Sequence, residues 1–157
     1  MLIGLACAQD VVLEGGRFVH RRLGYTIEQP GGQWSALPVE GADLAFRGPG
    51  NATLSLSSRC RTSVAAPRVL ARHLVIGVPD RSPLEGSAVE VDGGEGWFQR
   101  TLVRLDEQSR WLDSVTTVRG DCVLDFLLLA PVDSPELQAE FSGWWQSFRW
   151  PAEGEAP

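Results

Sequence analysis

The chain has 157 residues, of which 43% are hydrophobic and 22% are charged, and this is the composition of one ordinary globular domain rather than two. Its 14 basic and 20 acidic residues give a net charge of −6, which excludes nucleic acid as an expected partner. An anionic lipid surface would not attract such a chain by charge, so any attachment to a membrane requires acylation.

The first ten residues resemble the end of a bacterial lipoprotein signal, in which a cysteine receives a diacylglycerol and becomes the new N-terminus. Apolar residues and then Ala6 precede Cys7, and we predict a lipid anchor on Cys7. Only six residues precede it, fewer than the roughly 7–15 apolar residues of a full signal. Either the true start lies upstream and residues 1–10 are a remnant of the signal, or Cys7 is an ordinary thiol near a frayed terminus.

Short strands separated by turns are predicted for the N-terminal half. The predicted strands cover residues 11–19, 25–28, 43–47 and 52–58. The first bends at Gly15 and Gly16, and the second ends at the turn that begins with Pro30. Polar and apolar side chains alternate cleanly in the fourth, so one of its faces is covered and the other is polar or exposed.

A first helix is predicted to begin at Pro67, because proline is favoured at the first helical position, and to end at Gly77. Arg68 and Arg72 are expected to point outward. Four apolar side chains are expected to point inward, those of Leu70, Leu74, Val69 and Ile76.

Four further strands are predicted to follow as a meander, at residues 84–91, 97–105, 110–118 and 122–130. The last of them is apolar on both faces except for Asp125. Such a run requires cover on both sides, and we therefore expect a central strand between two layers.

The closing helix has the clearest pattern. Ser134 is expected to cap it, with Pro135 in its first turn and Glu136 favouring its positive end. Its apolar residues share one helical face, and they are Leu137, Phe141, Trp144, Trp145 and Phe148. We expect this stripe to be core, and the tail over residues 151–157 to be disordered.

Together these elements predict an α+β fold, a three-layer α/β/α sandwich with a largely antiparallel sheet of about seven strands and one helix on each face. The domain covers residues 11–150. Cys60 ends one predicted strand and Cys122 begins another. If these strands are antiparallel neighbours, a disulfide would close a loop of roughly 60 residues and stabilise the fold by around 4 kcal/mol. We favour this disulfide over two buried thiols, and its formation depends on export.

Several motifs resemble the PsbP-like family, whose sandwich fold is shared with the Mog-type Ran-binding proteins. Tyr25-Thr26-Ile27-Glu28-Gln29-Pro30 followed by Trp34 resembles the opening strand and turn of that family. The segment Ala42–Phe46, the strand that begins at Cys122 and the final helix fit as well. The resemblance is closest to small uncharacterised bacterial lipoproteins. It implies the fold and no activity, because photosystem binding and Ran binding depend on surfaces that have no residue-by-residue match here.

No catalytic or metal signature stands out. The sequence lacks zinc-ligand spacing and a Gly-x-Ser-x-Gly elbow, and its two histidines, His20 and His73, are expected to serve packing or solvation. Asp125 is either a functional acid or, as we favour, a carboxylate paired with an arginine or with backbone donors. A basic cluster is expected to be a solvated face rather than a site for an anionic partner, and it comprises Arg17, His20, Arg21 and Arg22.

Two functional hypotheses remain. The first is a non-enzymatic envelope lipoprotein, a monomer anchored through Cys7 and facing the periplasm, that acts as an accessory or protein-binding module for an unknown envelope protein. The second is a small-ligand-binding or hydrolytic domain with a pocket near Asp125 or His73. We favour the first, and we expect no cofactor. Convergence of His73, Asp125 and a serine would favour the second. Exposed aromatic residues would favour the first, and the candidates are Trp34, Trp97 and Trp111.

Overall fold

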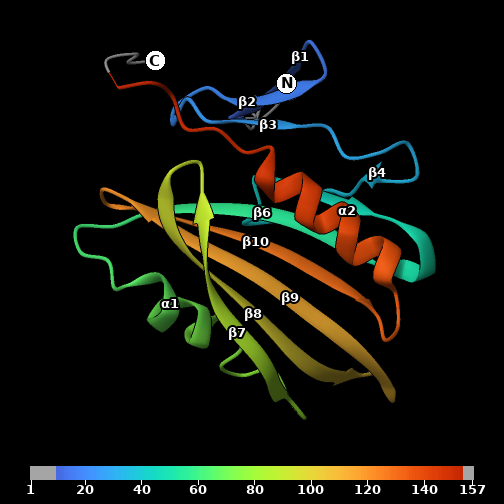
Figure 1. Cartoon of the computed structure of the whole chain (residues 1–157). Helices are drawn as coiled ribbons and strands as arrows, with labels where there is room; N and C mark the ends of the chain where they lie inside the picture. Colours follow the sequence, from blue (N-terminus) through green and yellow to red (C-terminus); the bar gives the residue numbers. More distant parts are fainter. Residues whose placement is uncertain (1–9, 154–157) are drawn as a thin grey trace, which may run out of the picture.

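The computed structural model describes residues 10–153 as an α+β fold with two antiparallel sheets and two α-helices (Figure 1). The small sheet has the order β1-β2-β3, and the main sheet has the order β4-β5-β6-β10-β9-β8-β7. The strands of the small sheet are β1 (Val11–Glu14), β2 (Arg17–His20) and β3 (Thr26–Glu28). Those of the main sheet are β4 (Ser35–Ala36), β5 (Leu44–Arg47), β6 (Thr53–Cys60), β7 (Ser82–Val91), β8 (Gly94–Leu105), β9 (Gln108–Arg119) and β10 (Cys122–Pro131). The helices are α1 (Pro67–Leu74) and α2 (Pro135–Gln146), and a 3-10 turn covers Pro49–Asn51.

β10 lies at the centre of the main sheet, between β6 and β9. This confirms the prediction from its apolar sequence. Leu124, Phe126 and Leu128 are buried on the face that α2 covers. Because side chains alternate along a strand, Asp125 points to the opposite face, where it is only 3% exposed.

α2 packs its predicted apolar stripe onto the main sheet. All five side chains of that stripe are buried, namely Leu137, Phe141, Trp144, Trp145 and Phe148. Phe126 meets the rings of Trp144 and Phe148 edge-on, with centroids 6.2 and 5.3 Å apart. Each such ring pair adds about 0.5–1.5 kcal/mol beyond its burial. Ser134 stands at the N-cap as expected, but its hydroxyl donates to the carbonyl of Pro131 instead of capping the helix.

α1 buries a different face from the one expected. Its buried residues are Pro67 and Ala71, which lie one turn apart. The four apolar side chains predicted to point inward are half-buried or exposed, namely Leu70, Leu74, Val69 and Ile76. The helix is only eight residues long and lies on a polar part of the sheet, so small residues bring its backbone close where large apolar ones were expected.

The layers differ from the expected sandwich in two respects. α1 contacts β8 and β9 on the face opposite α2 and leaves the rest of that face without a helix, so a complete third layer is not seen in residues 10–153 (Figure 1). The first two predicted strands do not join the main sheet. Gly15 and Gly16, both with positive φ, close a tight hairpin that pairs β1 with β2, and β3 completes the small sheet. The main sheet still has seven strands because β4, which was not predicted, pairs with β5.

A disulfide joins β6 to β10. Cys60 and Cys122 face each other in register at one end of the antiparallel pair, with Cα atoms 4.0 Å apart. The sulfur atoms are bonded, as the sequence analysis favoured. The link spans 62 residues and encloses α1 and three strands of the main sheet.

Replacing both cysteines, in the variant Cys60→Ala/Cys122→Ala, should lower the free energy of unfolding by about 4 kcal/mol, because the unfolded chain regains the entropy of the open loop. Urea unfolding of the oxidised wild type and the variant measures this difference. A thiol reductant should destabilise the wild type by a similar amount and leave the variant unchanged. Equal unfolding midpoints for the two oxidised proteins would contradict the prediction.

Candidate functional site

The predicted lipidation residue, Cys7, lies outside the described residues, so its acylation stays a prediction. Within residues 10–153, no helix is long and apolar enough to cross a bilayer. The same part of the chain contains no cluster of three His, Cys, Asp or Glu side chains that would hold a metal ion.

Asp125 is paired on both of its carboxylate oxygens. The hydroxyl of Thr116 donates to Oδ1 at 2.8 Å, and the guanidinium of Arg59 donates to Oδ2 at 3.2 Å. Burial raises the pKa of Asp125 above its ordinary value, and the bonds from Thr116 and Arg59 oppose that rise. This is the structural pairing weighed in the sequence analysis, and it leaves Asp125 a partner of the sheet rather than an open acid.

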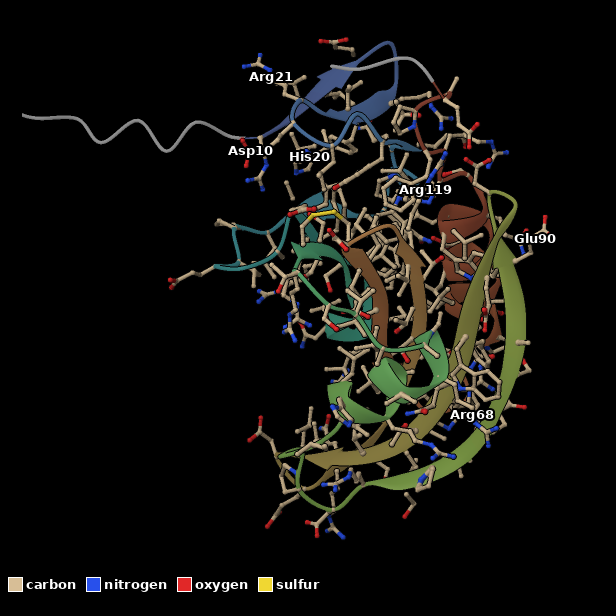
Figure 2. All side chains as sticks on the ribbon, turned by 90° about the vertical axis from the view of Figure 1, so that its left-hand side faces the viewer. Asp10, His20, Arg21, Arg68, Glu90 and Arg119 are labelled. Carbon is tan, nitrogen blue, oxygen red and sulfur yellow. A yellow bond between two sulfur atoms is a disulfide. The ribbon has the colours of Figure 1, made fainter. Side chains whose placement is uncertain are left out.

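The two histidines lie in different places and neither meets Asp125. His73 is exposed on α1, and no hydrogen bond or ion pair among the described residues joins it to Asp125. His20 is buried at the far end of the molecule from α1 (Figure 2). The convergence of His73, Asp125 and a serine that would favour a hydrolase is therefore not present in this region.

The basic cluster near the N-terminus does not form one surface. Arg17 donates to Glu28 and to the carbonyl of Ser147, at 3.3 and 2.7 Å. His20 is 1% exposed, whereas Arg21 and Arg22 are exposed. The cluster therefore splits into structural and solvated side chains.

None of the three tryptophans named as exposed candidates is fully exposed. Trp34 is buried, and its indole N–H donates to Glu140 at 2.6 Å. Trp97 and Trp111 are half-buried, and each lies beneath a guanidinium group. The arginine over Trp97 is Arg68, 5.1 Å from the ring centre, and this pair marks a pocket.

This pocket, which we call the α1 pocket, has a volume of about 510 Å³ and opens between α1 and the β7–β8 hairpin. Its floor is the α1 side of β8, because Trp97, Gln99 and Thr101 are alternate residues of that strand. The walls carry three arginines, of which Arg68 and Arg72 belong to α1 and Arg81 directly precedes β7. The pocket thus places cationic side chains above an aromatic and polar floor.

Two local contacts shape the α1 pocket. The amide of Gln99 is buried and donates to the carbonyl of Ala71 at 3.4 Å, which ties α1 to the sheet. Gly86 of β7 allows the Trp97 ring to lie against the strand, since a Cβ at this position would be 2.9 Å from Cζ2 of the ring. Helix and strand are thereby held at the two sides of the floor.

Arg68 and Arg72 are exposed, as the sequence predicted, but sequence reasoning did not detect the pocket that they line. A usable signal was present, because residues 44–79 contain five arginines and no aspartate or glutamate in a chain of net charge −6. Such a one-signed segment indicates a charged surface, although it does not show what faces that surface.

β7 forms an open edge of the main sheet beside the α1 pocket. It is the outermost strand, and eight of its ten residues are exposed (Figure 1). Within the described part of the chain, no backbone hydrogen bond from a turn or loop ends on residues 82–91. The opposite edge strand, β4, has only two residues.

Comparison with solved structures identifies the fold. The structure matches cyanobacterial PsbP (CyanoP) from Synechocystis sp. PCC 6803 with a TM-score of 0.68 at 17% identity, over 86% of this chain and 91% of that protein. It matches LpqN of Mycobacterium tuberculosis with a TM-score of 0.65 at 15% identity, over 82% of this chain and 84% of LpqN. A Pseudomonas aeruginosa protein of unknown function matches with a TM-score of 0.55 at 15% identity, over 87% of this chain and 93% of that one. No protein-family model and no curated protein sequence matches. The chain has a PsbP-like fold, as its motifs indicated.

His20 is a buried histidine whose surroundings oppose its protonation. Its Nδ1 accepts a hydrogen bond from the backbone N–H of Leu23 at 3.0 Å, and its Nε2 lies 3.9 Å from a carboxylate oxygen of Asp43. Burial lowers the pKa of His20 below its ordinary value of 6.5, although Asp43 acts in the opposite direction. The folded chain therefore binds a proton at His20 more weakly than the unfolded chain does.

Acidification should destabilise the fold through His20. The stabilising contribution of its neutral form is complete above pH 6.5 and is lost as the pH falls through and below that value. Urea unfolding between pH 7.5 and pH 5 should show a smaller loss of stability for His20→Asn than for the wild type. The exposed histidine gives the control, because His73→Asn should keep the pH dependence of the wild type. A wild-type slope in the His20→Asn variant would refute this assignment.

Proposed function

We propose that this protein is a non-enzymatic accessory protein of the bacterial envelope, held at the membrane by a lipid on Cys7, and that it acts by binding another envelope protein. The open edge of β7 is the observation that carries the proposal. The partner adds an extended segment to this edge, and the chain itself is a monomer that faces the periplasm.

The fold and the N-terminal sequence support the envelope location. LpqN, which shares the fold, is involved in cell envelope biogenesis in Mycobacterium tuberculosis. The residues before Cys7 resemble a lipoprotein signal, and the disulfide between Cys60 and Cys122 suits an oxidising compartment. These three features agree with export.

A binding role suits the known placement of the polar groups better than hydrolysis. Asp125 accepts bonds from Thr116 and Arg59 on separate oxygens, so its carboxylate is committed to the sheet. His73 is exposed, and no hydrogen bond or ion pair among the described residues joins it to Asp125. The alternative of a hydrolytic site near Asp125 or His73 gains no support from this geometry.

The backbone of β7 is arranged to accept another strand. Asp92 and Gly93 form the two-residue turn to β8, and both have positive φ, at 47° and 78°. In such a hairpin the flanking pair, Val91 and Gly94, is hydrogen-bonded, and the pairs alternate from there. The backbone N–H and C=O groups of Gly86, Ala88 and Glu90 therefore point away from β8. An extended peptide pairs with such groups by strand addition.

Acylation of Cys7 is tested by expressing the complete upstream reading frame in bacteria with labelled palmitate. We expect a labelled, membrane-associated product whose label disappears in Cys7→Ala. The doubly substituted Cys60→Ala/Cys122→Ala chain serves as the control for label on other thiols, and it should keep the label. An unlabelled wild-type product in the soluble fraction would exclude the anchor.

Strand addition at β7 is tested by placing a photoreactive amino acid at Glu90 and cross-linking in living cells of the source bacterium. We expect one defined adduct with an envelope protein. Ala88→Pro should reduce that adduct about tenfold, because proline removes an outward N–H and leaves the ladder with β8 intact.

The matched control is Ala88→Val, which enlarges the same side chain and keeps the N–H, and it should give the wild-type yield. An adduct that Ala88→Pro leaves unchanged would refute strand addition. An adduct between two copies of the chain would refute the monomer and assign the edge to self-association.

A further inference from the structure

We propose that the α1 pocket binds an amphiphile with a carboxylate or phosphate headgroup on an alkyl chain, the headgroup meeting the arginines and the chain covering the apolar rim. This inference rests on the arginines and the apolar rim of the pocket and does not require a partner at the edge of β7, although β7 contributes Leu84 and Gly86 to the lining. It assigns a ligand class to a site that the proposed function does not use.

The charge of the α1 pocket calls for an anion. Arg68 and Arg72 lie one helical turn apart, and like charges at this spacing repel each other. Arg81 adds a third positive charge at the same pocket, and the one hydrogen-bond acceptor of its guanidinium within residues 10–153 is the carbonyl of Val78. Among residues 10–153, none of these three arginines forms an ion pair with a carboxylate. A bound anion removes this repulsion.

Arginines with a structural role in this chain are paired with carboxylates. Arg100 donates to both carboxylate oxygens of Asp113, at 2.7 and 2.8 Å, and lies 3.4 Å from Glu85. Arg59 donates to one carboxylate oxygen of Asp125. In the described part of the chain, the arginines of the α1 pocket are not paired with a carboxylate. A guanidinium fork matches the paired oxygens of a carboxylate or phosphate.

The rim of the α1 pocket calls for an apolar group attached to that anion. Leu84 of β7 is 52% exposed at the rim and Val75 is half-buried there, and the Trp97 ring on the floor is half-buried as well. Ile76, the residue after Val75, is 65% exposed. An inorganic anion would leave this apolar surface in water, whereas an alkyl chain would cover it.

The site is held in place before a ligand arrives. The bond from Gln99 to Ala71 fixes α1, which carries Arg68 and Arg72, above the floor of the pocket. Trp97 supports the guanidinium of Arg68 from below. A volume of about 510 Å³ lies within the range of small-molecule pockets. Figure 2 shows Arg68 beside the β7–β8 side of α1, remote from Arg21 at the other end of the molecule.

Isothermal titration of the purified chain with dodecyl phosphate, kept below its micelle concentration, tests the proposal. We expect one-to-one binding that weakens as salt is added. Dodecyl maltoside has the same chain without the charge, and inorganic phosphate has the charge without the chain. Each should bind at least about tenfold more weakly than dodecyl phosphate. Equal binding of either control ligand would overturn the proposal.

Arginine variants locate the binding. The variant Arg68→Gln/Arg72→Gln should weaken dodecyl phosphate binding at least about tenfold, and Arg21→Gln, an exposed arginine outside the pocket, should leave it unchanged. Arg81→Gln lies outside the helix and should weaken binding even if the helix variant fails to fold. An equal loss in Arg21→Gln, or wild-type binding in both pocket variants, would refute the site.

Binding to lipid vesicles distinguishes a membrane lipid from a free amphiphile as the source of the ligand. Binding of the wild type to phosphatidylglycerol vesicles, lost in Arg81→Gln, would support the site and identify a membrane lipid as its ligand. Binding of dodecyl phosphate without binding to vesicles would support the site and identify a free amphiphile. Binding to neither would overturn the proposal.

Discussion

Phe126, in the middle of β10, is buried between the main sheet and the rings of Trp144 and Phe148, and this contact organises the molecule. Phe148 in turn meets Tyr25, at 5.2 Å between ring centres, so the same cluster fixes the small sheet. The bridge between Thr26 and Arg149 completes that attachment. The aromatic core therefore connects the central strand, α2 and the N-terminal hairpin in one contact network.

Concentration of the core on the α2 side leaves the opposite face of the sheet polar. Thr116 and Asp125 lie side by side in the register on that face, and Trp97 is the cross-strand neighbour of Thr116. A short helix held by Pro67, Ala71 and one amide bond covers part of it. Because little apolar surface is buried there, charged side chains remain available beside the sheet instead of being excluded by packing.

The sequence predicted burial correctly for elements whose own apolar pattern requires a covered position. The stripe on α2 and the doubly apolar run of β10 each require a covered position whatever their partners are. It failed where the choice of partner decided the outcome. Nothing in the alternation of residues 11–28 distinguishes pairing within a small sheet from pairing with the main one. For α1, the assumption that apolar side chains point inward was wrong, because the sheet beneath it is polar.

The pairing of Asp125 with Arg59 is easier to predict from the sequence than the α1 pocket is. Once Cys60 and Cys122 are joined across an antiparallel pair, the register places Ser57 opposite Asp125 and Arg59 on the diagonal of the same face. The pairing of Arg59 with Asp125 therefore follows from the disulfide when residues are counted along the two strands. The α1 pocket has no such constraint, since it depends on how the connection from β6 to β7 places α1 on the sheet.

The two faces of the main sheet thus separate stability from binding. Substitutions at Phe126 or Trp144 remove buried aromatic contacts and threaten the fold, whereas those at Arg68 or Arg72 remove charges that repel each other. When the buried core lies on one face of a sheet, substitutions on the other face cost less stability. The same backbone can therefore carry different side chains on that second face. CyanoP and LpqN share this fold with the chain at 17% and 15% identity, so the architecture does not depend on one particular set of surface residues.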